Sequence, residues 1–201
     1  MRKKWLQSLM AVGLALVIAG VPLLYHRYRL TTAKRLREVE PGKFYRSGQM
    51  TAEGLVDTIA RLKIRTVVNV QNEFPDPDLR HGFLDWHTDS ERELCERLGV
   101  RYVWIAPDLI SRRKVPDQHP LAIDEFLALM DDPANYPVLL HCKAGLNRTG
   151  CLAAVYRLEY QGWTKAEAMD ELKDLGFGDS ACTAANDYIE QYVLAYRRRS
   201  R

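Results

Sequence analysis

Cysteine is scarce in this chain: there are four among 201 residues, and their positions match neither metal-ligand spacing nor a disulfide framework. The histidines form no cluster in the sequence, and there is no glycine-rich nucleotide loop and no internal repeat. The formal net charge of +3 is too small to indicate nucleic-acid binding by itself. These absences argue against a zinc module, a disulfide scaffold, a nucleotide-binding enzyme and a repeat protein. We therefore expect neither a metal nor a cofactor.

What the chain does contain is one long hydrophobic run near its N-terminus, at residues 9–25. A run of about 17 residues is at the short limit for crossing a bilayer. Residues 1–8 before it and 26–38 after it are basic, which suits an uncleaved anchor. A cleaved signal peptide is the alternative, although Ala19-Gly20-Val21 is a weak cleavage site, and a plain apolar helix is a third. We predict a single membrane-spanning anchor.

The rest of the chain suits one catalytic domain at residues 39–196, joined to the run by the basic linker at 26–38 and followed by a basic tail at 197–201. A hydrophobic content of 47% is ample for a core. Strands are predicted at 43–49, 66–70, 100–105 and 136–140, and helices at 51–62, 91–98, 121–130, 164–175 and 181–196, with 75–85 irregular. Strands separated by helices predict an α/β fold with a mainly parallel sheet and helices on both faces.

Residues 141–150 read His-Cys-Lys-Ala-Gly-Leu-Asn-Arg-Thr-Gly and connect the strand at 136–140 to a helix over 152–158. A helix start carries unpaired N–H groups and the positive end of the helix dipole, so it attracts anions. Successive N–H groups of the loop can form a cradle for a tetrahedral oxyanion, and Gly145 lets the loop curl. The predicted phosphate-binding residues are Lys143, Ala144, Gly145, Leu146, Asn147 and Arg148.

Three side chains of this segment carry the predicted chemistry. Cys142 stands at the mouth of the loop, where nearby cations and the helix start favour its thiolate, a nucleophile aimed at the phosphorus of a bound phosphate. Arg148 can hold two phosphate oxygens with its planar guanidinium, which a lysine could not do as well. Thr149 can donate a hydrogen bond to the sulfur and stabilise it as a leaving group.

The pattern His-Cys-x-x-Gly-x-x-Arg-Thr-Gly resembles the active-site motif of the cysteine-based protein tyrosine phosphatases. Over roughly residues 39–196 the chain resembles their atypical dual-specificity branch, and residues 43–49 resemble its entry strand. For Arg46 in that strand, a structural ion pair is favoured over substrate contact. The resemblance implies a general acid, an Asp on the loop before the helix at 121–130, because a leaving oxygen departs faster when protonated. Asp108 fits that place. Asp117, which as a helix-starting residue suits an N-cap, is the alternative, and the absence of a dedicated acid is a third.

The sequence therefore predicts a phosphatase that hydrolyses phosphate monoesters through a cysteinyl-phosphate intermediate, of the dual-specificity or tyrosine protein phosphatase type. Phosphoinositides and RNA 5′-triphosphates are alternative substrates, because the loop also resembles those of such enzymes in the same superfamily. Leu146 stands where the inositol-pyrophosphatase-like relatives usually carry a basic residue. A non-catalytic phosphate-binding module is the alternative of another class. The expected partners are a phosphorylated protein or phospholipid and, through the N-terminal run, the membrane. There is no strong nucleic-acid signal.

The catalytic domain is expected to face the cytoplasm. Lys and Arg are more numerous after residues 9–25 than before them, which favours retention of that side in the cytoplasm. A thiolate at Cys142 is also vulnerable to oxidation, so a reducing compartment suits it.

Overall fold

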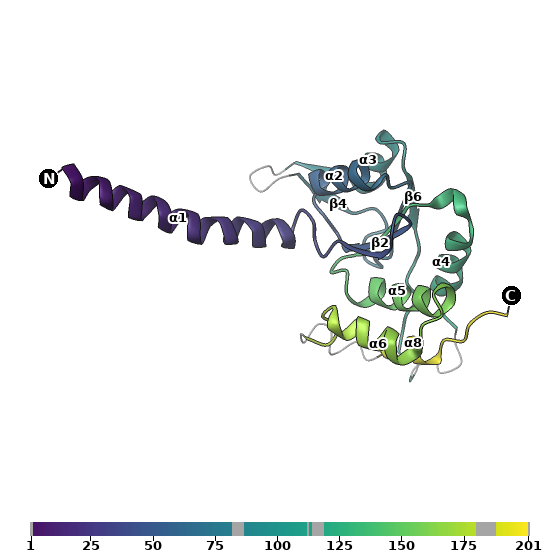
Figure 1. Ribbon diagram of the computed structural model, residues 1–201. Helices are drawn as coiled ribbons and strands as arrows, with labels where there is room; N and C mark the ends of the chain where they lie inside the picture. The colour runs from purple at the N-terminus through teal and green to yellow at the C-terminus, as the bar shows by residue number, and fades with distance from the viewer. Residues whose placement is uncertain (1, 82–86, 112, 114–118, 180–187, 201) are drawn as a thin grey trace.

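The computed structural model describes residues 2–81, 87–111, 113, 119–179 and 188–200. Figure 1 shows an α/β domain from which one long N-terminal helix projects. The helices are α1 (Arg2–Leu30), α2 (Ala52–Leu62), α3 (Glu91–Arg97), α4 (Leu121–Asp131), η1 (Pro133–Asn135), α5 (Asn147–Tyr160), α6 (Lys165–Asp174) and α8 (Tyr188–Ala195). The strands are β1 (Arg37–Glu40), β2 (Phe44–Gly48), β3 (Thr66–Asn69), β4 (Asp78–Arg80), β5 (Thr88–Ser90), β6 (Arg101–Trp104) and β7 (Val138–Cys142).

The main sheet has the strand order β1-β2-β7-β3-β6. β7 lies at its centre and pairs in parallel with β2 on one side and β3 on the other, and β6 pairs in parallel with β3. Only the edge strand β1 is antiparallel to its neighbour β2. The predicted α/β class with a mainly parallel sheet is therefore confirmed. Ligands of such sheets bind at the carboxyl ends of the strands, where β7 ends with Cys142.

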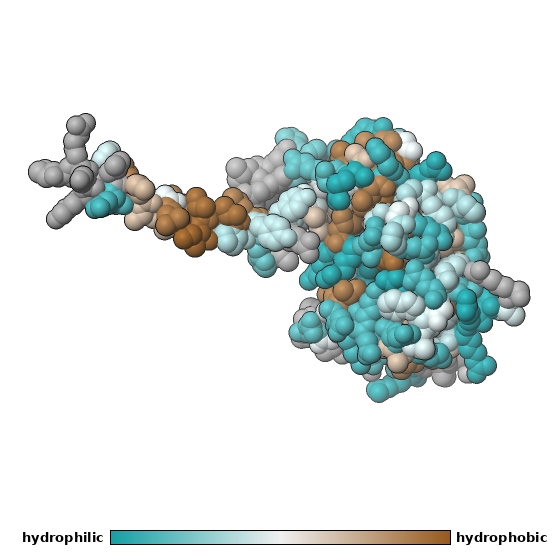
Figure 2. Space-filling view, viewed as in Figure 1, coloured by the Kyte–Doolittle hydropathy of each residue, from teal (hydrophilic) through white to brown (hydrophobic). Residues whose placement is uncertain are grey.

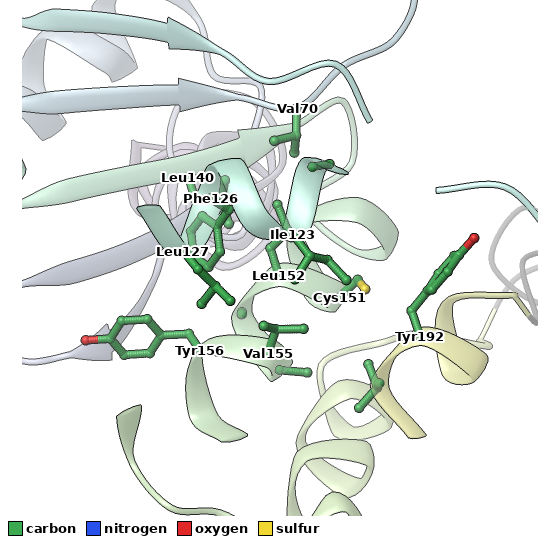
Figure 3. Close-up of a cluster of buried hydrophobic side chains, with 14 of the residues drawn as sticks. Val70, Ile123, Phe126, Leu127, Leu140, Cys151, Leu152, Val155, Tyr156 and Tyr192 are labelled. Atoms are coloured by element: carbon green, nitrogen blue, oxygen red, sulfur yellow. The ribbon is translucent and has the colours of Figure 1, made fainter. Parts of the chain in front are cut away.

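Alternate residues of the buried strands face two separate hydrophobic cores, as period-2 geometry requires. Leu139 of β7 packs in the core shared with α2 and α3, whereas its neighbour Leu140 packs in the core shared with α4, α5, α6 and α8. Figure 3 shows this larger core, in which Phe126 of α4 and Leu152 of α5 lie beside Leu140. Helices therefore cover both faces, α2 and α3 on one and the remaining core helices on the other (Figure 1).

Helix starts follow the capping residues that the sequence offers. The side chain of Thr51 accepts a hydrogen bond from the N–H of Gly54 at the start of α2, and Ser90 caps α3 in the same way. Thr164 and Glu167 form a capping box at the start of α6. The helices predicted at 51–62, 91–98 and 164–175 therefore begin within one residue of their predicted starts.

Two predicted segments differ from the structure. Residues 75–85 were expected to be irregular, but β4 lies within them and pairs antiparallel with β5. The reason is that this short Asp-Leu-Arg strand has little intrinsic β preference and exists through its partner, which the local sequence does not reveal. Of the helix predicted at 181–196, the structure has α8 from Tyr188, while 181–187 lie outside the described residues.

The N-terminal helix continues past the predicted anchor to Leu30, so part of the predicted linker at 26–38 is helical. Its segment Leu9–His26 has a mean hydropathy of 2.0 and none of it is buried. Figure 2 shows the resulting hydrophobic surface on the projecting helix. By length and composition this one helix is able to cross a membrane, and a signal sequence would pass the same test.

The basic C-terminal tail, predicted at 197–201, is held against the domain in its described part. Arg199 forms ion pairs with Asp131 at the end of α4 at 2.8 Å and with the buried Glu159 of α5 at 3.0 Å. The hydroxyl of Tyr196 also donates to Glu159 at 2.8 Å. The tail therefore joins α4 and α5 to the C-terminus.

Candidate active site

The sulfur of Cys142 lies at the end of the central strand, where the chain turns into α5. Its residue is only 4% exposed, and its Sγ accepts a hydrogen bond from the N–H of Gly145 at 3.2 Å. α5 begins at Asn147, and the residue before it, Leu146, provides no side-chain cap for the helix. The first N–H groups of α5 are therefore left for another acceptor, as in many anion sites.

Glycine is required at the centre of this loop. Gly145 has a φ of +75°, and a Cβ added there would stand 2.5 Å from the nitrogen of Gly48. The loop thus curls directly against the end of β2, in a conformation that other residues rarely adopt. The glycine singled out from the sequence serves both the turn and this close approach.

Two arginines hold the loop from outside by its carbonyl groups. Arg46 of β2 is buried and donates to the carbonyl of Gly145 at 2.8 Å, and Arg35 donates to the carbonyl of Ala144 at 2.9 Å. Burial lowers the pKa of Arg46 to about 10. Arg46 therefore acts structurally, as expected, although it does so through a hydrogen bond to a backbone carbonyl and not through the predicted kind of contact, an ion pair. Arg35 was missed because it was assigned to the linker.

A pocket of about 230 Å³ opens in front of the sulfur. Its lining comprises Glu73, Phe74, Cys142, Lys143, Ala144, Asn147, Arg148 and Tyr188. Of the predicted phosphate-binding residues, Lys143, Ala144, Asn147 and Arg148 thus meet in one cavity with the predicted nucleophile. Gly145 and Leu146 belong to the same loop, but both are buried and neither lines the pocket.

The guanidinium of Arg148 is occupied by a carboxylate. Its two terminal nitrogens donate to the two oxygens of Glu73 at 2.8 and 3.0 Å. These hydrogen bonds hold the pKa of Glu73 down at about 2 and raise that of Arg148. The planar pair is the geometry with which arginine binds carboxylate or phosphate. Glu73 was not singled out from the sequence, although it follows β3, whose carboxyl end lies beside that of β7.

The hydroxyl of Thr149 is buried and has no hydrogen-bond partner among the described residues. Its predicted bond to the sulfur therefore stays a prediction.

His141, the residue before Cys142 in β7, is also buried and forms an ion pair with the buried Glu91 of α3 at 2.9 Å. This contact joins the strand that carries Cys142 to a helix on the face of the sheet opposite to α5.

Asp108, the predicted general acid, is positioned at the start of α4. Its carboxylate accepts hydrogen bonds from the N–H groups of Leu121 at 2.8 Å and Ala122 at 3.0 Å. It thereby caps α4, whose own N-cap residue, Pro120, provides no side-chain bond. Asp108 is not among the residues that line the pocket. Asp117, the alternative acid, lies outside the described residues.

The described residues contain no group of three or more His, Cys, Asp or Glu side chains that could hold a metal ion. The three cysteines in this part of the chain, Cys95, Cys142 and Cys151, are free and buried. Cys151 is fully buried in the larger core, where burial raises its pKa to about 12. It packs as a small core residue.

Comparison with known proteins decides the family. Residues 26–188 match the family described as "DSP-PTPase phosphatase fused to NAD+ Kinase". The chain belongs to the atypical cysteine-based dual-specificity phosphatases. It is 32% identical to the dual specificity protein phosphatase TpbA of Pseudomonas aeruginosa over 187 residues, which cover 87% of this chain and 74% of the relative.

Two further similarities concern a relative with a different named substrate and a solved structure. The chain is 28% identical to the inositol diphosphatase SIW14 of Saccharomyces cerevisiae, over 75% of this chain and 48% of the relative. The crystal structure of P. aeruginosa TpbA superimposes with a TM-score of 0.58 and 26% identity, over 82% of this chain and 86% of that one. The chain is therefore a cysteine-based phosphatase, and its relatives differ in the substrates that their names state.

Proposed function

We propose that this phosphatase hydrolyses phosphate monoesters through a cysteinyl-phosphate on Cys142 and acts as a dual-specificity or tyrosine protein phosphatase. The Cys142 thiolate attacks phosphorus, the phosphorus–oxygen bond of the ester breaks, and water then releases phosphate from the sulfur. The Arg148 guanidinium and the loop N–H groups stabilise the oxygens of the transferring phosphoryl group. The observation that carries this proposal is the pocket in which the sulfur and the guanidinium meet.

The contact between Arg148 and Glu73 supports the assignment of the phosphate position. A carboxylate already occupies both donors of the guanidinium in the arrangement that a phosphate would use. A substrate phosphate must therefore displace the Glu73 carboxylate before Arg148 can bind it. Glu73 thus competes with substrate for the same two donors.

Protonation of the leaving group is assigned to Asp108, with Asp117 as the alternative. For this role the Asp108 carboxylate must leave the start of α4 and reach the pocket, so a movement of the loop that carries it is part of the proposal. Its replacement is expected to slow turnover strongly on alkyl phosphates and weakly on activated aryl phosphates, because only a basic leaving oxygen needs the proton. If Asp117→Asn shows this dependence and Asp108→Asn does not, the assignment to Asp108 is wrong.

The experiment that tests the proposal is turnover of para-nitrophenyl phosphate by the full chain and by Cys142→Ser. The serine hydroxyl stays protonated where a thiolate would form, so turnover should vanish while inorganic phosphate still binds. Substantial residual turnover would remove Cys142 as the nucleophile. A wild-type chain that binds phosphate without any turnover would instead indicate a non-catalytic binding module.

The substrate class is tested by a turnover panel with phosphotyrosine and phosphoserine peptides, a phosphoinositide, an inositol diphosphate and an RNA 5′-triphosphate. The similarity to TpbA, named a dual specificity protein phosphatase, supports the peptides. The similarity to SIW14, named an inositol diphosphatase, favours an inositol diphosphate as the second candidate. Leu146 supplies no charge to the loop, which weakens the second candidate. Faster turnover of the inositol compound than of any peptide would reverse this order.

The proposal includes a place in the cell, which depends on the N-terminal helix α1. Its segment Leu9–His26 anchors the chain in a membrane, and the catalytic domain faces the cytoplasm. The exposed apolar surface of that segment supports membrane attachment.

A further inference from the structure

The segment that joins α1 to the sheet, residues 31–36, packs against the catalytic domain. The N–H of Gly48, at the end of β2, donates to the carbonyl of Lys34 at 2.8 Å. The backbone of Thr32 lies directly over Gly54 of α2, where an added Cβ would stand 1.9 Å from the carbonyl oxygen of Thr32. The residues that follow the candidate anchor therefore form one wall of the domain, beside the phosphate loop.

A second pocket, of about 200 Å³, opens between this segment and the phosphate loop. Three cationic side chains from separate parts of the chain line it: Lys34 from the joining segment, Arg80 from β4 and Lys143 from the phosphate loop. One carboxylate, that of Asp78, also lines it. Among the described residues that line the pocket, cations outnumber carboxylates, so the field of these residues favours an anion.

This pocket adjoins the active site. Lys143 lines both cavities, so the two share a wall made by the phosphate loop. Burial and the charges of Lys143 and Arg35 lower the pKa of Lys34, while the interaction with Cys142 opposes this shift. The cations therefore repel one another at close range, and a bound anion would relieve that repulsion.

We propose that the second pocket binds a second phosphate group when a phosphate already occupies the active site. The inference rests on the proposed function, which places the first phosphate in front of Cys142. It adds a binding site for a second phosphate group. The second phosphate belongs either to the same soluble molecule or to the headgroup of a membrane lipid beside α1. In both cases the recognised group is a compact phosphate dianion held by Lys34, Arg80 and Lys143.

The test compares two probes by calorimetry on the full chain in neutral detergent, with Cys142→Ser to prevent turnover. Binding of inorganic phosphate at low concentration reports the active site, whereas tripolyphosphate brings further linked phosphates to the adjoining pocket, with which the active site shares Lys143. Lys34→Met keeps the aliphatic stem that packs on Gly48, and Arg80→Gln keeps a polar side chain. Together they should weaken tripolyphosphate binding by roughly tenfold, through loss of two charge-assisted contacts, and leave phosphate binding unchanged. Lys63→Met, on an exposed lysine at the end of α2 that does not line the pocket, is the matched control.

Nanodiscs distinguish the two sources of the second phosphate. If a lipid headgroup fills the pocket, discs that contain phosphatidic acid should weaken tripolyphosphate binding relative to pure phosphatidylcholine discs, and the Lys34→Met/Arg80→Gln variant should not respond. Equal binding in both discs assigns the pocket to a soluble ligand. The proposal is overturned if the double variant binds tripolyphosphate as tightly as its parent. Failure of the proposed function would be recognised by a different measurement, because the unmodified chain would then not turn over para-nitrophenyl phosphate.

Discussion

Glu73, a residue outside the phosphate loop, controls whether the guanidinium of Arg148 is available to bind phosphate. The pair is bidentate, but the side chain of Glu73 is 56% exposed, so water competes for its carboxylate. Such pairs stabilise by up to about 1 kcal/mol, or roughly a fivefold change in an equilibrium constant. A dianionic phosphate, which carries more charge, is therefore able to displace the carboxylate.

We predict that Glu73→Gln binds phosphate more tightly. The amide keeps the shape of the side chain and loses the charge that competes for Arg148. The inhibition constant of inorganic phosphate should fall, by up to about fivefold, with Glu53→Gln in the first turn of α2 as the control. Weaker phosphate binding in the Glu73 variant would mean that the carboxylate positions Arg148 instead of competing for it.

At the scale of an element, α4 depends on a residue from outside the helix. Asp108 accepts hydrogen bonds from its first N–H groups, because Pro120 provides no cap. Asp108→Ala should therefore lower the free energy of unfolding by about 1 kcal/mol, as loss of an N-cap typically does. Denaturant unfolding of the full chain in detergent measures this.

Asp108→Asn separates capping from catalysis. Asn keeps one of the two oxygens that accept hydrogen bonds from Leu121 and Ala122, so it caps α4 better than Ala does, and it has no acidic proton to donate. The variant should be more stable than Asp108→Ala and, if Asp108 is the general acid, lose turnover of alkyl phosphates as fully as that variant does. Unchanged turnover of alkyl phosphates would leave Asp108 as a cap alone.

The elements were predictable where the signals are local. The caps at Thr51, Ser90 and Thr164 each depend on residues that are close in sequence, and the helices predicted at 51–62, 91–98 and 164–175 begin beside them. The strand–loop–helix around Cys142 is local in the same way, and β7 and α5 follow one another as predicted. The contact of Arg35 with Ala144, across 109 positions, and that of Arg148 with Glu73, across 75, depend on the completed sheet. No local pattern records such pairs. Three of the eight residues that line the pocket, Glu73, Phe74 and Tyr188, were therefore found only in the fold.

At the scale of the whole molecule, the buried carboxylate of Glu159 joins α5 to the C-terminal tail. Burial raises its pKa, but hydrogen bonds from Tyr196 and Arg199 outweigh burial, and the net pKa lies below its usual 4.5. A carboxyl group with a depressed folded pKa contributes stability above its unfolded pKa and loses it as the pH falls through the folded value.

We therefore predict that the wild-type chain loses more stability than Glu159→Gln when the pH is lowered from neutral to below 4.5. The neutral amide lacks the titrating group, so its unfolding free energy should depend less on pH. Thermal or denaturant unfolding at a series of pH values gives the comparison. Parallel curves for the two chains would show that Glu159 does not couple the tail to acid stability.

Placement of the whole molecule at a membrane follows from α1, but its orientation is a separate matter. The structure draws Lys34, Arg35 and Arg37, which were counted toward a cytoplasmic flank, into the domain: Lys34 and Arg35 bind the end of β2 and the phosphate loop, and Arg37 begins β1. All three still lie within about 20 residues of the apolar segment and, with Arg27 and Arg29, outnumber Arg2, Lys3 and Lys4 on the other side. The charge count and the need of the Cys142 thiolate for a reducing compartment therefore both favour a cytoplasmic domain.

We expect alkaline carbonate to leave the full-length chain in the membrane and detergent to release it, and the catalytic domain to resist protease in intact spheroplasts. Digestion from outside would reverse the orientation, and recovery of a shortened soluble chain would replace the anchor by a cleaved signal peptide.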